Sequence, residues 1–203
     1  QLRKLFAGER VTTQEGRNKL QAVKLATTPI QPQLPIYLAG IGTKGLRLVG
    51  EIADGVVLNA YVPPAYVRYA VAEIRAAAAA AGRDPNAIDI ACMLVIRLTD
   101  DPAKMRATLK QRIVRLFEEP YVGEILLDKG GFDPSILPRL RAIIKSDGEK
   151  AAVPLITDAM VDAFYVVGSA MQCQERIAEY REAGVTTPLL LPRLEDYGAV
   201  ATT

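Results

Sequence analysis

The stretch "IYLAGIGTKGLRLVGEIADGVVLNA" (Ile36 to Ala60) is the most informative part of the sequence about the fold class. It begins with an apolar run that has the composition of a buried strand, continues through glycines into a helical pattern from Lys44 to Ala53, and ends in a second apolar run, "GVVLN". Strands that are apolar on both faces are typical of parallel sheets covered by helices. The stretch therefore predicts one βαβ unit.

The same alternation continues toward the carboxyl end and predicts an α/β fold of parallel βαβ units. The expected elements are helix Pro64–Ala81, strand 88–98, helix Pro102–Phe117, helix 170–184 and strand 187–193. Toward the amino end we expect a short helix over 2–7, a hairpin over 11–25 with a Glu-Gly turn, and a proline-rich connector over 26–35. The segment 118–156, with Gly130-Gly131 and several prolines, interrupts the rhythm and predicts an insertion.

The composition favours an enzyme-sized globular protein that handles small molecules. Of the 203 residues, 50% are hydrophobic, and 25 Lys and Arg nearly balance 23 Asp and Glu, giving a formal charge of +2. That balance offers no electrostatic reason to expect a nucleic acid or a membrane as partner, and no apolar run is long enough to span a bilayer. We therefore expect a cytoplasmic protein with a small-molecule substrate.

Two residue types limit the chemistry. Histidine is absent, which excludes a His-containing triad and a His general base in this chain. The only cysteines, Cys92 and Cys173, lie far apart and suggest packed thiols in a reducing compartment rather than a disulfide. We expect no metal site.

Gly40, Gly42 and Gly45 form the pattern G-x-G-x-x-G between a strand and a helix. A dinucleotide-binding fingerprint also needs an acidic residue at the end of the next strand, where Asn59 stands, and Asp54 precedes that strand. Two other interpretations remain open. The turn could bind a phosphate through backbone N–H groups and the Thr43 hydroxyl, or it could be a tight strand-to-helix turn without a ligand.

Three segments together resemble the luciferase-like monooxygenase superfamily, and within it the F420-dependent oxidoreductases of the methylenetetrahydromethanopterin reductase type. They are "PIYLAGIGTKGLRLVGEIADGVVLN", the helix end "AGRDP", and "YVVGSAMQCQERIAEYREAGVTTPLLLP". The resemblance implies a (β/α)8 TIM-barrel fold, of which this chain covers roughly strands five to eight. Residues 1–203 would then form the C-terminal part of one barrel domain with an insertion around 118–156.

The resemblance also implies the cofactor site. Residues 39–44 resemble the family's cofactor-phosphate turn, commonly Ala-Ala-x-Gly-Pro-Lys, and depart from it at Gly40 and Thr43. A second family segment near the phosphate corresponds to the end of the next strand. The implied cofactor-binding residues are Ala39, Gly40, Ile41, Gly42, Thr43, Leu58 and Asn59.

No catalytic residue is nominated, because the resemblance assigns most ring contacts and substrate chemistry to the first four strands. Four acidic residues that could suggest chemistry are interpreted as solvated, capping or helix-face charges: Glu118, Glu119, Asp158 and Asp162.

The resemblance implies an enzyme that transfers hydride between the deazaflavin of coenzyme F420 and an organic substrate, for example in a methylenetetrahydromethanopterin reductase-like reaction. The alternatives are an FMN-dependent monooxygenase on the same fold and a non-catalytic half-barrel module. A half-barrel leaves open strand edges near Ile36 and Leu191. We therefore expect the remainder of the same barrel, or a homo-oligomer, to cover them, and activity to require the missing half.

Overall fold

The computed structural model describes residues 1–14, 16, 19–27, 29–31 and 33–201. The chain forms two compact units, Gln1–Ile36 and Tyr37–Thr203. In the smaller unit, helix α1 (Leu2–Phe6) precedes an antiparallel hairpin of β1 (Val11–Thr13) and β2 (Leu20–Val23), in which Val11 pairs with Val23. The predicted helix and hairpin are confirmed, while Glu15 of the predicted turn lies outside the described residues.

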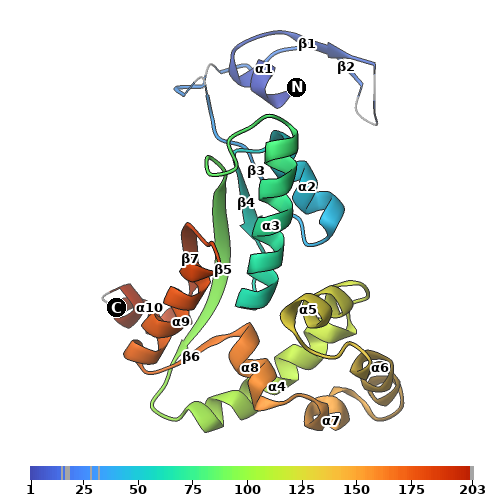
Figure 1. Cartoon of the computed structure of the whole chain (residues 1–203), viewed down its shortest axis with the longest axis vertical. Helices are drawn as coiled ribbons and strands as arrows, with labels where there is room; N and C mark the ends of the chain where they lie inside the picture. The colour runs from blue at the N-terminus through green and yellow to red at the C-terminus, as the bar shows by residue number, and fades with distance from the viewer. Residues whose placement is uncertain (15, 17–18, 28, 32, 202–203) are drawn as a thin grey trace. The chain divides into compact units, whose positions relative to one another are not determined.

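The larger unit is built on a parallel sheet whose central member is β5 (Asp89–Leu98). Its first residues pair with β4 (Gly55–Leu58), Ala91–Val95 pair with β7 (Thr187–Leu191), and Ile96–Leu98 pair with β6 (Val166–Gly168). The short strand β3 (Tyr37–Leu38) extends the sheet beyond β4. Every pairing in this sheet is parallel, which confirms the predicted βαβ organisation; β5 is the long strand in Figure 1.

Three helices carry apolar faces into the core beside this sheet: α2 (Thr43–Ile52), α3 (Pro64–Ala80) and α9 (Ala170–Glu182). Leu46, Ile74 and Tyr180 are among the buried side chains that join them to the sheet. Cys92 and Cys173 are buried and free, as expected, and burial raises the pKa of their thiols to about 12 and about 11. None of the helices in the described part of the chain combines the length and hydropathy needed to cross a membrane.

The backbone groups at several helix ends are satisfied by polar contacts, some of which could be expected from the sequence. Gly82 follows α3 with a φ of +70°, the left-handed conformation in which glycine commonly ends a helix. The next residue, Arg83, donates hydrogen bonds to the carbonyls of Gly50 and Ala53 and so satisfies the end of α2. Ser169 and Gln172 form a capping box at the start of α9.

A group of helices follows the carboxyl end of β5 in Figure 1. It comprises α4 (Pro102–Glu118), α5 (Val122–Gly130), α6 (Ile136–Asp147), α7 (Glu149–Ala152), the 3-10 turn η1 (Val153–Leu155) and α8 (Asp158–Phe164). Phe117 of α4 packs edge-to-face on Phe164 of α8, with ring centroids 5.5 Å apart. The predicted helix 102–117 is therefore confirmed, but it packs against helices of the segment that follows it rather than against the sheet alone.

The strand β6, the 3-10 turn η2 and the helix α10 were not predicted from the sequence. Strand β6 contains three residues, too few to give a periodic pattern. The described chain ends in a 3-10 turn, η2 (Leu194–Asp196), and helix α10 (Tyr197–Ala201).

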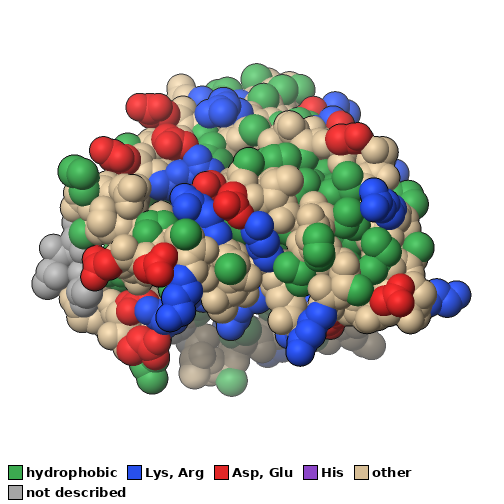
Figure 2. Space-filling view, turned by 90° about the horizontal axis from the view of Figure 1, so that it is seen from below, with side chains coloured by type: hydrophobic (Ala, Val, Ile, Leu, Met, Phe, Trp, Pro, Cys, Tyr) green, Lys and Arg blue, Asp and Glu red, His purple; other side chains and the backbone are tan. Residues whose placement is uncertain are grey.

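The face seen in Figure 2 carries positive and negative side chains interspersed with hydrophobic ones. On the helices after β5, Arg106 pairs with Asp162 (2.7 Å) and Lys110 pairs with Asp158 (2.7 Å). Both carboxylates are therefore helix-face charges, as the sequence analysis expected.

Helices α2 and α3 approach closely at Gly50. A Cβ atom there would lie 2.3 Å from the Ile74 carbonyl oxygen and 2.8 Å from the Ala77 Cβ. We expect Gly50→Ala to force the helices apart and to lower the free energy of unfolding by about 1 to 3 kcal/mol. Urea denaturation measures this, with Leu48→Ala on the exposed side of α2 as control. Equal stability of Gly50→Ala and wild type would contradict the close contact.

A single carboxylate connects the amino ends of three strands. Asp89 accepts hydrogen bonds from the hydroxyls of Tyr37 (2.7 Å), Thr187 (2.9 Å) and Thr186. Partial burial alone would raise the pKa of Asp89, but the hydrogen bonds from Thr186, Tyr37 and Thr187 outweigh it and lower the pKa below its ordinary value.

This lowered pKa predicts a pH dependence. Because the folded state holds the Asp89 proton less tightly than the unfolded state, the contribution of Asp89 is present above about pH 4 and is lost as the pH falls further. Wild type should lose more stability between pH 5 and about pH 3 than Asp89→Asn does, as measured by urea midpoints. The exposed Glu175→Gln serves as control, and parallel pH profiles of wild type and Asp89→Asn would refute the role of Asp89.

Candidate functional site

A buried tyrosine holds the turn between β3 and α2 by a hydrogen bond. The hydroxyl of Tyr66, which is fully buried on α3, donates to the carbonyl of Ile41 at 2.7 Å. Burial raises the pKa of Tyr66, so its hydroxyl remains a donor at neutral pH. The path of the turn is thus tied to the helix behind it.

The glycines of this turn are required for space. Neither glycine is needed for its backbone freedom, because Gly42 has a φ of −95° and Gly40 also lies outside the left-handed region. A Cβ on Gly40 would lie 3.2 Å from the backbone carbon of Gly45, and a Cβ on Gly42 would lie 2.0 Å from the hydroxyl of Tyr121. The pattern therefore permits close approach of backbone and side chain.

Helix α2 begins directly after this turn. Gly42 occupies the N-cap position and provides no side-chain cap, while the Leu46 N–H closes the first helical turn on the Gly42 carbonyl (3.0 Å). The first N–H groups of a helix and its dipole favour an anion. Thr43 contributes a hydroxyl, which lies 2.6 Å from the hydroxyl of Tyr69, and Lys44 is exposed beside it.

A mostly apolar cavity of about 400 Å³ opens next to the turn. It is lined by Ala39, Gly40, Ile41, Val57, Asn59, Met93 and Val122. Four of the predicted site residues therefore meet in one cavity: Ala39, Gly40, Ile41 and Asn59.

The other three predicted residues lie outside the lining of this cavity. Gly42 and Thr43 stand at the N-terminus of α2, and the side chain of Leu58 is 1% exposed within the hydrophobic core. Any contact from Leu58 to a ligand would thus be made by its backbone. Asn59 is exposed, and its side-chain oxygen accepts the N–H of Ala60 at 2.9 Å, which restrains the carboxamide.

Three lining residues were missed by sequence reasoning. Val57 lies two positions before Asn59 and so shares its face of β4, a signal that was available in the sequence. Met93 can be placed beside the turn only when the register of β4 and β5 is known, in which Val57 pairs with Ala91. Val122 comes from α5 and has no local signal that links it to the turn.

The arrangement suits a phosphate-bearing ligand with an apolar part. Helix N–H groups and the Thr43 hydroxyl stand beside the turn, and the adjoining cavity is largely apolar. No acidic side chain lines this cavity to hold a ribose. Among the described residues, no group of three or more His, Cys, Asp or Glu side chains is arranged to hold a metal ion.

Comparison with known proteins identifies the family. The model of the luciferase-like monooxygenase family matches residues 1–187, and the chain belongs to this family. The predicted resemblance is thereby confirmed.

Particular relatives carry a more specific name. The 5,10-methylenetetrahydromethanopterin reductase of Methanolobus tindarius is 34% identical over 186 residues, which cover 91% of this chain and 56% of that protein. The protein of the same name from Methanopyrus kandleri is 30% identical, covering 75% of this chain and 43% of its own. The chain spans about half the length of these relatives.

A solved structure agrees with the sequence comparison. The coenzyme F420-dependent tetrahydromethanopterin reductase from Methanopyrus kandleri superposes with a TM-score of 0.78 at 25% identity, covering 95% of this chain and 55% of that one. The larger unit therefore has an α/β luciferase-like fold similar to that of F420-dependent TIM-barrel enzymes.

The anchor of the turn can be tested by removing one oxygen atom. Tyr66→Phe should lower the free energy of unfolding by about 1 to 2 kcal/mol, because the Ile41 carbonyl loses its buried donor. Urea denaturation provides the measurement, and Tyr121→Phe, at a residue 61% exposed, is the matched control. Equal stability of Tyr66→Phe and wild type would show that the hydrogen bond is replaced by water.

Proposed function

We propose that the protein is an F420-dependent oxidoreductase that transfers hydride between the deazaflavin cofactor and an organic substrate. A reaction of the 5,10-methylenetetrahydromethanopterin reductase type is favoured by the names of its relatives. The observation that carries the proposal is the turn Gly40–Thr43, which joins an uncapped helix N-terminus to an apolar cavity in a chain of this family.

The residues present fit the phosphate-bearing part of such a cofactor. The α2 N-terminus offers backbone donors, and Thr43 can donate its hydroxyl while accepting from Tyr69, because either oxygen of that pair can be the donor. The cofactor-binding set we propose is Ala39, Gly40, Ile41, Gly42, Thr43, Leu58 through its backbone, and Asn59. When bound, F420 supplies the hydride-exchanging carbon C5 of its deazaflavin, and the chain's part is to bind and orient it.

In the proposed (β/α)8 barrel, β3, β4, β5 and β7 correspond to strands five to eight. The sheet order β3-β4-β5-β7 supports this assignment, because neighbouring barrel strands follow one another along the chain. Strand β6 would then be an addition, which among the described strands pairs with the carboxyl end of β5 alone. The whole of 1–203 is proposed as part of one barrel domain, with the insertion around 118–156.

Several properties of the whole protein belong to the same proposal. In the described part of the chain, β3 pairs only with β4 and β7 pairs only with β5. We propose that the remainder of the barrel, or a second copy in a homo-oligomer, covers these edges. A small-molecule substrate and a cytoplasmic location complete the proposal.

Equilibrium titration with F420, FMN and NADH tests the identity of the cofactor. F420 should bind at least tenfold more tightly than FMN, and NADH should bind poorly, because Asn59 stands where a dinucleotide site needs an acidic residue. Tighter binding of FMN would instead support a flavin-dependent monooxygenase. Tight NADH binding that Asn59→Ala abolishes would refute the assignment of the turn.

The contribution of Thr43 can be isolated with two variants. Thr43→Ala should weaken F420 binding by about 1 kcal/mol, roughly fivefold, if one hydrogen bond is lost, while Thr43→Ser retains the hydroxyl and should bind like wild type. Fluorescence titration gives both dissociation constants. Unchanged affinity of Thr43→Ala would show that its hydroxyl makes no contact with the cofactor.

A further inference from the structure

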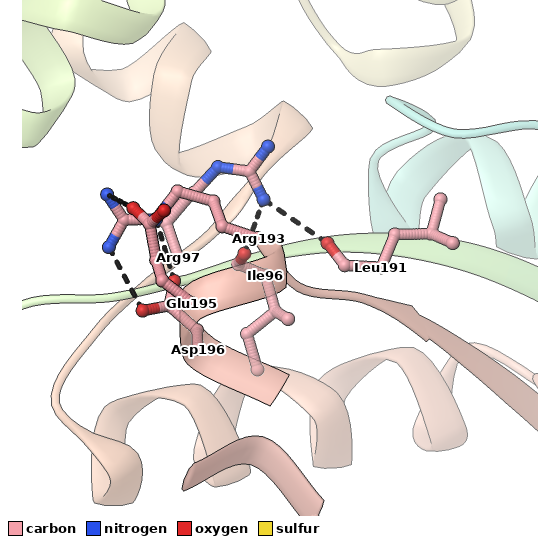
Figure 3. A network of polar contacts seen from close by, with 6 residues as sticks. All are labelled: Ile96, Arg97, Leu191, Arg193, Glu195 and Asp196. Carbon is pink, nitrogen blue, oxygen red and sulfur yellow. Dashed lines mark hydrogen bonds and ion pairs between the residues drawn. The ribbon is translucent and has the colours of Figure 1, made fainter. Parts of the chain in front are cut away.

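A second polar region lies at the carboxyl end of β5, away from the glycine turn. Arg97, the penultimate residue of β5, donates through Nη1 to the carbonyls of Ile96 (2.6 Å) and Leu191 (3.2 Å). Figure 3 shows the guanidinium held by these two oxygens. Arg97 is only half-buried, so the rest of its head group remains within reach of a ligand.

Two of the acidic side chains near Arg97, Glu195 and Asp196, are bound by another arginine, whereas Asp100 and Asp101 line the same cavity as Arg97. Arg193 binds Asp196 through Nε (2.7 Å) and Nη2 (3.1 Å), and it binds Glu195 through Nη1 (3.1 Å). In Figure 3 both carboxylates face Arg193. Among the residues that the structure describes, no ion pair includes Arg97.

The unused part of Arg97 has a defined shape. A guanidinium has five N–H donors, and the two carbonyl contacts occupy those of Nη1. For Nε and Nη2 the described chain supplies no hydrogen-bond partner. These two nitrogens form the planar edge that binds a carboxylate or phosphate in bidentate fashion.

A second arginine without an acidic partner lies nearby. Arg112 is exposed on α4, and no ion pair of the described residues includes it. Arg97 and Arg112 both line a cavity of about 590 Å³, and Arg112 and Thr108 also line an adjoining cavity of about 600 Å³. Burial lowers the pKa of Arg97, and the positive charges of Arg112 and Arg193 act in the same direction, so an anion would relieve an existing repulsion.

One buried tyrosine hydroxyl among the described residues of this region lacks a hydrogen-bond partner. The hydroxyl of Tyr165 is buried and has no hydrogen-bond partner in the described structure, although it lies within electrostatic range of Arg97 and Arg112. Its ring packs on Tyr61, with centroids 5.1 Å apart, and Tyr61 holds a φ of +67° just after β4. Such a backbone conformation in a non-glycine residue is costly and is found preferentially at functional sites.

The location favours a substrate over a structural ion. In open or closed parallel sheets, ligands bind at the carboxyl ends of the strands, where Arg97 stands. Met93 lines the cavity beside the glycine turn, and Arg97 follows it by four residues on the same face of β5. At about 3.3 Å per residue, the two positions are roughly 13 Å apart.

We propose that Arg97 and Arg112 bind an oxyanionic group, a carboxylate or a phosphate, of the organic substrate. The substrate would reach from the cavity at Met93 toward Arg97, whose backbone position lies roughly 13 Å further along β5. The rim also carries Lys104, Asp100 and Asp101, of which Asp101 caps α4 by accepting the Lys104 N–H at 3.0 Å. The identity of the ligand rests on the proposed function, whereas the anion site rests on the two arginines.

Calorimetric titration of the protein with inorganic phosphate and with succinate tests the site. Arg97→Gln and Arg112→Gln should each weaken the binding of at least one probe about ten- to hundredfold, and the probe affected distinguishes a phosphate from a carboxylate site. Arg106→Gln is the matched control, because this substitution removes the same charge from the same helix as Arg112→Gln. Arg106 is already paired with Asp162 and is therefore not expected to bind the probe. Equal probe affinity in all four proteins would overturn the proposal.

Titration of the same variants with F420 separates the two proposals. Unchanged F420 affinity in Arg97→Gln and Arg112→Gln supports a substrate site, whereas a parallel loss of F420 and probe binding would assign the anion to the cofactor and overturn the inference. Failure of wild type to bind F420, with the probe results as expected, would refute the proposed function and leave the anion site standing. If Arg97→Gln does not fold, the exposed Arg112→Gln alone decides the outcome.

Discussion

Strand β5 forms backbone pairings along both of its edges, and these pairings determine how the strands of the larger unit are arranged. A ten-residue strand is long enough to pair with β4 at its start, with β7 along its middle and with β6 at its end. Because all these pairings are parallel, the carboxyl ends of the strands meet on one side, together with the loops that follow them. The parallel arrangement of the strands around β5 therefore brings the glycine turn, the cavity and the arginines to the same side of the sheet.

Strands β3, β4, β5 and β7 could be predicted from the sequence because each lies in a continuous apolar run between turn signals, whereas β6 is too short to show such a run. Helices α3 and α9 were predictable for a similar reason, since Gly82 follows the end of α3 and Ser169 caps the start of α9. The partners of α4 were not predictable. Its amphipathic pattern fits a sheet or other helices equally well, and only the tertiary contact of Phe117 with Phe164 distinguishes them.

In the candidate site too, residues close in sequence could be predicted, whereas contacts between residues far apart in sequence could not. Ala39, Gly40 and Ile41 are neighbours in sequence, and Asn59 ends the next strand, so a family pattern can gather them. The need for glycine at position 42 could not be predicted from the sequence, because the side chain that would meet a Cβ there is Tyr121, 79 positions later at the start of α5. Arg97 has no sequence signal at all. Its significance arises because Arg193, almost a hundred residues later, binds the neighbouring carboxylates.

The close contact of α2 with the alanine-rich α3 has a mechanical consequence for the turn. Gly50 lies seven residues from the first residue of α2, about 10 Å along the axis of a stiff helix. If the helix pivots at this contact, a tilt of only about 6° moves its first N–H groups by roughly 1 Å, a displacement that can cost a binding or catalytic site much of its effect. Ala77 and Ala78 of α3, which meet the Cβ position of Gly50, would then hold the first turn of α2 in place from about 10 Å away, so two small residues remote from the turn contribute to its position.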